Sequence, residues 1–109
     1  EMQQHIEDFD TDVMQMIISD DRSIGVLETI SNNGIMEVHG LYILEEYQNS
    51  KIGTRVMTGL IRKAASKKNK IILQVLKVNK RAKDFYLRLG FTILREDERH
   101  YKMIYKPVE

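Results

Sequence analysis

Short blocks of apolar residues separated by polar turns occupy the first part of the chain. Three apolar stretches are bounded in this way: 13–18, 24–30 and 35–44. Such stretches are typical of β-strands. The Asn33-Gly34 pair is a strong hairpin signal, because both residues tolerate positive φ. The pattern therefore predicts three strands in an antiparallel meander.

Beyond residue 50 the apolar spacing becomes helical. Ile52, Val56, Leu60 and Ala64 recur every four residues, which predicts an amphipathic helix over about 50–67. Asn69 is the candidate for a left-handed residue that ends this helix. The next apolar run, 71–76, is interrupted only by Gln74, which predicts a strand covered on both faces and parallel to the third strand.

A second helix is predicted between Asn79 as N-cap and Gly90 as C-cap. Two further strands, at about 91–96 and 101–106, flank a charged turn. The expected fold is α/β, an α+β mixed sheet: an antiparallel meander followed by a β-α-β crossover, a helix and a C-terminal hairpin. We expect one domain over 1–109. Apolar residues at positions 2, 6 and 9 are typical of a helix tail.

Composition narrows the function classes. The chain has 109 residues, of which 42% are apolar, and 17 basic residues nearly balance 16 acidic ones, so no charge excess indicates nucleic acid or a membrane as partner. The absence of cysteine excludes thiolate metal sites and a cysteine acyl-enzyme, and three scattered histidines form no metal-binding pattern. No apolar run approaches the roughly 18 residues that span a bilayer. We expect a cytoplasmic protein without a bound metal.

The junction of the third strand with the first helix is a candidate anion site. Backbone amides at a helix N-terminus are free, and the helix dipole is positive there. Residues 48–53 occupy this junction, where Gly53 permits close approach and Lys51 or Arg55 adds positive charge. Taken alone, such a turn is more often an ordinary polar connection.

Two segments resemble the signatures of the GNAT family of acyl-CoA-dependent N-acyltransferases. The run 37–54 resembles the family's strand-turn-helix with its turn pattern Gln/Arg-x-x-Gly-x-Gly/Ala, although Lys51 stands where glycine is usual. The run 79–91 matches the pattern Asn-x-x-Ala-x-x-Phe-Tyr-x-x-x-Gly-Phe at every specified position. The resemblance covers about 12–106, and it implies that the family's first strand and helices would precede this chain.

The resemblance implies acetyl-CoA or CoA as co-substrate. In the family the pantetheine arm pairs with the backbone of the third strand, and the turn amides hold the pyrophosphate. An asparagine at the start of the second helix hydrogen-bonds the pantetheine amides. Carried onto this sequence, the cofactor-binding residues are Leu41, Tyr42, Ile43, Gln48, Asn49, Ser50, Lys51, Ile52, Gly53, Thr54 and Asn79.

Tyr86 is the candidate general acid. It follows Asn79 by seven residues, two turns along one helix face, so both side chains could reach one ligand. The family places its acid at this position, and a phenol can protonate a departing thiolate because their unperturbed pKa values, about 10 and about 8.5, are close. The alternative is that Tyr86 serves only as a core aromatic residue.

The general base is less defined. Many family members carry a carboxylate on the strand after the crossover helix, but the matching residue here is Gln74, which cannot accept a proton at neutral pH. Glu37 and His39 share a face of the third strand with Leu41 and Ile43, unless a bulge changes the alternation. Glu37 is the preferred candidate, acting directly or through a water.

The resemblance, together with these residues, predicts an N-acetyltransferase that transfers an acetyl group from acetyl-CoA to a primary amine by direct attack in a ternary complex. The alternative is a non-catalytic acyl-CoA-binding or regulatory module. A third hypothesis is an RNA- or protein-binding domain that uses the basic run Lys63–Lys70. The amine acceptor stays unidentified, and an uncovered sheet edge would favour a homodimer.

Overall fold

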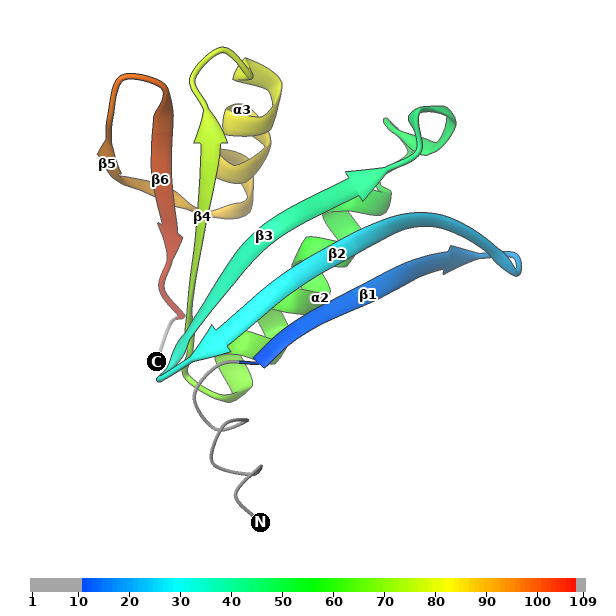
Figure 1. Cartoon of the computed structure of the whole chain (residues 1–109), viewed down its shortest axis with the longest axis horizontal. Helices are drawn as coiled ribbons and strands as arrows, with labels where there is room; N and C mark the ends of the chain where they lie inside the picture. The colour runs from blue at the N-terminus through cyan, green and yellow to red at the C-terminus, as the bar shows by residue number, and fades with distance from the viewer. Residues whose placement is uncertain (1–10, 108–109) are drawn as a thin grey trace.

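The computed structural model of the chain describes residues 11–107, which form a six-stranded sheet in the order β1-β2-β3-β4-β6-β5 (Figure 1). The strands are β1 (Thr11–Ser19), β2 (Arg22–Asn32), β3 (Ile35–Ile43), β4 (Lys70–Leu76), β5 (Thr92–Glu96) and β6 (His100–Tyr105). The helices are the short 3-10 helix η1 (Glu45–Tyr47) and the α-helices α2 (Ile52–Ser66) and α3 (Lys80–Leu89). This arrangement confirms the predicted mixed α/β fold. The predicted helix tail at residues 2–9 lies outside the described residues.

The strand pairing follows the predicted order of elements. β1, β2 and β3 form an antiparallel meander, and β5 and β6 form an antiparallel hairpin. Asn33 and Gly34 turn the chain between β2 and β3 with φ values of 50° and 82°, as the hairpin signal requires. α2 connects β3 to the parallel strand β4, which completes the predicted crossover unit.

β3 and β4 are paired over only part of their length. Their parallel register runs from Ile35 opposite Lys70 to Val38 opposite Leu73. Beyond this point the two strands diverge, with β3 leading toward α2 and β4 toward α3 (Figure 1). The sheet therefore opens between residues 39–43 and 74–76.

The ends of the helices show which polar residues act as caps. Oδ1 of Asn79 accepts a hydrogen bond from the backbone N–H of Ala82 at 3.1 Å, and Gly90 ends α3 with φ 108°. Both predicted caps are confirmed. The predicted cap of α2 is wrong by one residue, because Lys68 adopts the left-handed conformation with φ 58°. The N–H of Asn69 then bonds the carbonyl of Ala64 at 2.8 Å, which completes the C-terminal turn.

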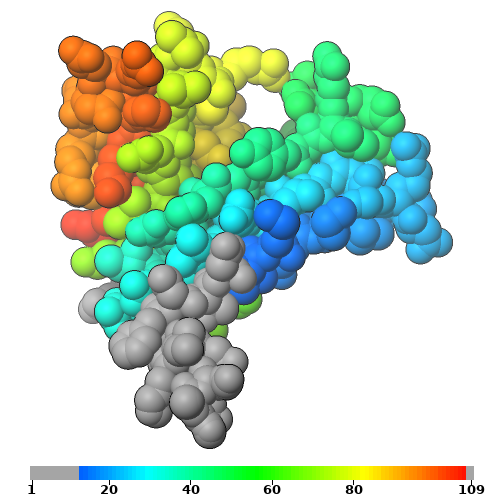
Figure 2. Space-filling model, viewed as in Figure 1, coloured from blue at the N-terminus to red at the C-terminus, as the bar shows by residue number. Residues whose placement is uncertain are grey.

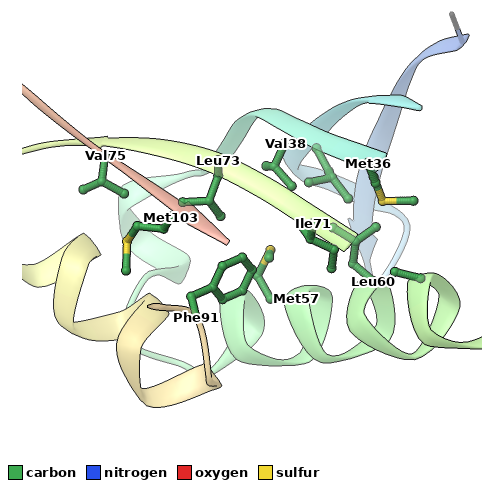
Figure 3. Packing of buried hydrophobic residues seen from close by; sticks show 11 residues of the cluster. Met36, Val38, Met57, Leu60, Ile71, Leu73, Val75, Phe91 and Met103 are labelled. Carbon is green, nitrogen blue, oxygen red and sulfur yellow. The ribbon is translucent and has the colours of Figure 1, made fainter. Parts of the chain in front are cut away.

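The core lies between the sheet and the two helices. Figure 3 shows Met57 of α2 beside Phe91, which follows α3, and Leu60 of α2 beside Ile71 of β4; all four belong to one buried cluster that also contains Leu73 and Met103. Met57 and Met103 are fully buried. Both α-helices of the described chain lie on this one face of the sheet.

Within residues 11–107 β4 is covered on one face only, so the prediction of cover on both faces is wrong there. Ile71, Leu73 and Val75 are buried against the helices, whereas Gln74 and Leu76 are exposed on the other face, Leu76 to 48%. A continuous apolar run therefore marks the central position of β4 in the sheet but not a second covering layer within the described residues.

A β-bulge in β3 decides which side chains reach which face. The neighbours Glu28 and Thr29 in β2 pair with Gly40 and Val38, so His39 is an extra residue in β3. The extra residue reverses the alternation of side chains along the strand. A Cβ atom on Gly40 would lie 2.6 Å from Cε2 of Tyr42, so the tyrosine ring occupies the space that a larger residue would need.

Candidate active site

A cavity of about 590 Å³ opens where β3 and β4 diverge, on the helix side of the sheet. Its walls come from the end of β3, the turn after it, the first turn of α2 and one face of α3. Figure 2 shows an opening between the yellow start of α3 and the green turn that precedes α2. The lining residues are Leu41, Ile43, Tyr47, Gln48, Asn49, Lys51, Gly53, Thr54, Arg81, Ala82, Phe85, Tyr86 and Arg88.

The N-terminus of α2 presents free backbone amides at this cavity. Lys51 is the N-cap and makes no side-chain cap, and the first intrahelical bond runs from Arg55 N–H to the carbonyl of Lys51 at 3.1 Å. The N–H groups of the first turn, including those of Gly53 and Thr54, therefore have no partner within the helix. The positive end of the helix dipole adds to their attraction for an anion.

The turn keeps its shape through left-handed residues and side-chain hydrogen bonds. Asn49 and Lys51 have φ values of 66° and 68°. Nε2 of Gln48 donates to the carbonyl of Ile43 at 2.9 Å, and the hydroxyl of Ser50 donates to the carbonyl of Tyr47. The predicted residues Gln48 and Ser50 thus brace the turn with their side chains, which leaves the backbone amides for a ligand.

Lys51 adopts the conformation for which glycine is better suited. A non-glycine residue in the left-handed region costs roughly 1–2 kcal/mol. The lysine is exposed and lines the cavity, so its ammonium group adds positive charge beside the free amides. The departure from the family's glycine pattern therefore keeps the backbone shape and adds a cation.

Tyr86 lines the same cavity from α3. Its ring is half-buried and packs edge-on against Phe85 and Phe91, with centroid distances of 5.0 and 5.5 Å. Burial raises the pKa of the Tyr86 phenol, so the hydroxyl is protonated at neutral pH. The ring therefore packs against the core and the residue also borders the cavity, while its role as general acid stays a prediction.

Asn79 occupies a different place from the one that its spacing with Tyr86 predicts. Its Oδ1 caps α3, and the residue is absent from the lining of the cavity that contains Tyr86. The side-chain NH₂ group remains the part of Asn79 that could donate to a ligand at the start of α3.

A second cavity of about 600 Å³ lies at the other face of the diverging strands. Glu37, His39, Tyr42 and Gln74 are among its lining residues. Nε2 of His39 lies 2.8 Å from Oε1 of Glu37, so these two side chains form a pair on this face.

The bulge at His39 separates the two sets of candidates on β3. Leu41 and Ile43 line the first cavity with Tyr86, whereas Glu37 and Tyr42 line the second. The conditional expectation that Glu37 shares a face with Leu41 and Ile43 therefore does not hold. Of the remaining predicted residues, Ile52 borders a small pocket with Ile17 behind the turn, and Ser50 lines neither large cavity.

Five residues that line the first cavity were not among the predicted site residues: Tyr47, Arg81, Ala82, Phe85 and Arg88. The four on α3 lie at i, i+1, i+4 and i+7, and Arg81, Phe85 and Arg88 share one helix face. This spacing is visible in the sequence, but the sequence does not show that this face of α3 borders the first cavity.

The described residues contain neither a metal-binding cluster nor a membrane-spanning helix. Among residues 11–107, no group of three or more His, Cys, Asp or Glu side chains is arranged to hold a metal ion. Over the same range, neither α-helix is long and apolar enough to cross a membrane.

Solved structures with the same fold include several acetyltransferases. The PaiA N-acetyltransferase of Thermoplasma acidophilum, solved with coenzyme A, matches 87% of this chain with a TM-score of 0.80 and 24% identity. The ribosomal-protein-S18-alanine N-acetyltransferase of Escherichia coli matches 90% with a TM-score of 0.80 and 14% identity. An acetyltransferase of Bacillus cereus matches 96% with a TM-score of 0.76 and 13% identity.

This chain corresponds to 60%, 70% and 84% of the lengths of these three proteins, in the same order. No curated protein matches its sequence. A sequence model of the acetyltransferase (GNAT) family, however, matches residues 1–91, which is most of the chain and includes the turn before α2 and the whole of α3. With the fold and the family sequence in agreement, the chain belongs to the GNAT acetyltransferase family.

Proposed function

We propose that this chain is the catalytic part of an N-acetyltransferase that transfers an acetyl group from acetyl-CoA to a primary amine. The observation that carries the proposal is the cavity at the diverging strands, where the free amides of α2 and the phenol of Tyr86 border one space. Family membership and the coenzyme A in the Thermoplasma structure support acetyl-CoA as the co-substrate.

The cofactor would be held mainly by backbone groups. The amides at the start of α2 bind the diphosphate, and Lys51 adds charge there. The pantetheine arm lies along the end of β3, where the backbone of Leu41, Tyr42 and Ile43 has no partner from β4, and it pairs there like an added strand. The thioester then lies in the gap between the strands.

The transfer needs one nucleophilic step and two proton movements. The amine nitrogen attacks the thioester carbonyl carbon, and the carbon–sulfur bond breaks as the tetrahedral intermediate collapses. Tyr86 gives its proton to the departing thiolate, and the amine proton passes to Glu37, directly or through a water. A backbone N–H of β3 stabilises the oxyanion. Acetyl group, protons and electron pairs are all accounted for without a covalent enzyme intermediate.

The position of Glu37 fits an acceptor that enters from the face opposite the cofactor. Glu37 lines the second cavity, which meets the gap between β3 and β4 from that side. The amine and the thioester would approach one another through the gap, so the base and the acid act on opposite sides of the reacting carbon.

A non-catalytic acyl-CoA-binding module is the second candidate. It is favoured by Gln74, which is exposed in the second cavity and cannot act as a base. Such a module would bind CoA in the first cavity and show no transfer to any amine. Measurement of labelled acetyl transfer over a panel of primary amines separates the two candidates.

CoA binding itself is tested by thermal unfolding. CoA at roughly one millimolar should raise the melting temperature of the chain, because a ligand that binds only the folded state stabilises it. At 100 times its Kd this stabilisation of the folded state is about 2.7 kcal/mol. Gly53→Asp should abolish the rise, because the new carboxylate would repel the phosphates of CoA. The variant should still fold, since a carboxylate at a helix N-terminus is favourable and the added Cβ would lie at an ordinary contact distance of 3.5 Å from Phe85. Gly59→Asp is the matched control, because nothing lies within 4 Å of its added Cβ on the same helix. An unchanged melting temperature for the unmodified chain would contradict the proposal.

A further inference from the structure

The charged side chains that line the first cavity are all cationic. Lys51, Arg81 and Arg88 line it, and no Asp or Glu of the described residues does. The whole chain has 17 basic and 16 acidic residues, so its overall composition does not explain this local excess. Unopposed positive charge in a cavity favours a ligand that carries several negative charges.

The two arginines lie on one face of α3, on either side of Phe85. Arg81 and Arg88 are seven residues apart, which places them two turns and about 10.5 Å apart along the helix axis. A Cβ atom on Gly53 would lie 3.5 Å from Cζ of Phe85, so this face of α3 borders the first turn of α2.

The arginines differ in what they contact. A guanidinium nitrogen of Arg81 donates to Oδ1 of Asn49 at 2.5 Å, which ties Arg81 to the turn before α2. Arg88 is exposed, and it forms no ion pair or side-chain hydrogen bond with any residue between 11 and 107. Its planar donors are therefore available for a phosphate group, which guanidinium binds in a bidentate manner.

We infer that Arg88 binds a second phosphate group, separate from the diphosphate at the α2 turn. The inference rests on the proposed function, because coenzyme A carries a diphosphate and, on its ribose, a 3′-phosphate. The turn amides and Lys51 hold the diphosphate, and Arg81 braces the turn through Asn49. Arg88 is the remaining cation of the cavity, and it selects the 3′-phosphorylated cofactor over its dephosphorylated form.

The test compares the binding of CoA and 3′-dephospho-CoA by calorimetry at one salt concentration. The unmodified chain should bind CoA about tenfold more tightly than dephospho-CoA, close to the lower end of the range for a hydrogen bond to a charged group. Arg88→Gln should bring the ratio of the two affinities close to one and keep the affinity for dephospho-CoA. Arg81→Gln should weaken both ligands by the same factor, because it loosens the turn that both use.

Arg62→Gln is the control, since Arg62 is an exposed arginine of α2 outside the cavity, and it should keep the tenfold ratio. Equal binding of the two ligands by the unmodified chain overturns the 3′-phosphate site but leaves CoA binding intact. A ratio that persists in a folded Arg88→Gln variant, checked by circular dichroism, also overturns it. Failure of the unmodified chain to bind either ligand contradicts the proposed function itself.

Discussion

Glu37 and Tyr86 lie on opposite faces of the sheet. Glu37 is exposed on the face that neither described α-helix covers, whereas Tyr86 packs against the core from α3. The two side chains can act on one reacting carbon only through the gap beside Val38 and Leu73, where the pairing of β3 and β4 ends. The proposed transfer is therefore confined to that gap.

Tyr86→Phe tests the acid. It keeps the ring that packs against Phe85 and Phe91 and removes only the hydroxyl. We expect kcat to fall about 100-fold, the lower range for general acid catalysis, with CoA affinity unchanged within about twofold. Steady-state kinetics with the best amine of a panel and CoA titration give the two values. An unchanged kcat would show that Tyr86 is only a core aromatic residue.

Glu37→Gln tests the base. The substitution preserves the shape of the side chain but removes its ability to accept a proton, so kcat should fall about 100-fold while CoA binding persists. Glu98→Gln, in the exposed turn between β5 and β6, is the control for loss of one negative charge. Equal rates for the two variants would exclude Glu37 as the base.

Substitutions at Lys51 separate the effect of its left-handed backbone on stability from the effect of its ammonium group on CoA binding. Lys51→Gly and Lys51→Ala both remove the ammonium group, but only glycine adopts the φ of 68° without strain. The glycine variant should be more stable to urea than the alanine variant by about 1 kcal/mol. Both should bind CoA more weakly than the unmodified chain and equally to one another. Equal stability of the two variants would mean that the left-handed conformation is not retained.

Asp97 gives the fold a dependence on pH. Its carboxylate accepts hydrogen bonds from the backbone N–H groups of Arg99 and His100 at 2.8 and 2.7 Å, and these bonds lower its pKa. In the unfolded chain the pKa of the Asp97 carboxyl is higher, about 3.9. The stabilisation is therefore complete at pH values above this pKa and is lost as the pH falls through the pKa of Asp97 in the folded state.

Asp97→Asn should therefore lower the melting temperature at pH 7, and the difference from the unmodified chain should shrink as the solution is made acidic. Thermal unfolding between pH 7 and pH 3 measures this, with Glu98→Gln as the control in the same turn. A difference that stays constant across this range would rule out the carboxylate as its cause.

The sequence contains enough local information to predict the elements and their order. Apolar spacing locates α2, and the polar atoms of Asn79 and the missing side chain of Gly90 mark the ends of α3. These are short-range effects, decided within one or two turns of the chain. The turn before α2 could be predicted for the same reason, because its resemblance rests on contiguous residues.

The placement of the candidate base depends on pairing between distant residues. The bulge at His39 arises because Val38 and Gly40 pair with neighbouring residues of β2, and no local pattern in β3 reveals this. Likewise, the apolar run 71–76 gives no indication that, among the residues the structure describes, only one face of β4 is covered. The cationic lining of the cavity appears only when α3 is placed beside α2.

The short pairing between β3 and β4 also divides the sheet into two plates, β1-β2-β3 and β4-β6-β5, joined by four residue pairs. Local opening of the sheet should occur more easily between β3 and β4 than within either half, because fewer hydrogen bonds must break there. Amides of β3 beyond Val38 that lack a partner should exchange with deuterium ahead of those in the meander. Acetyl-CoA bound in the gap would hydrogen-bond the free edge of β3, hold the two halves of the sheet together and slow this exchange. The substrate would then stabilise the fold in the way that an additional strand does.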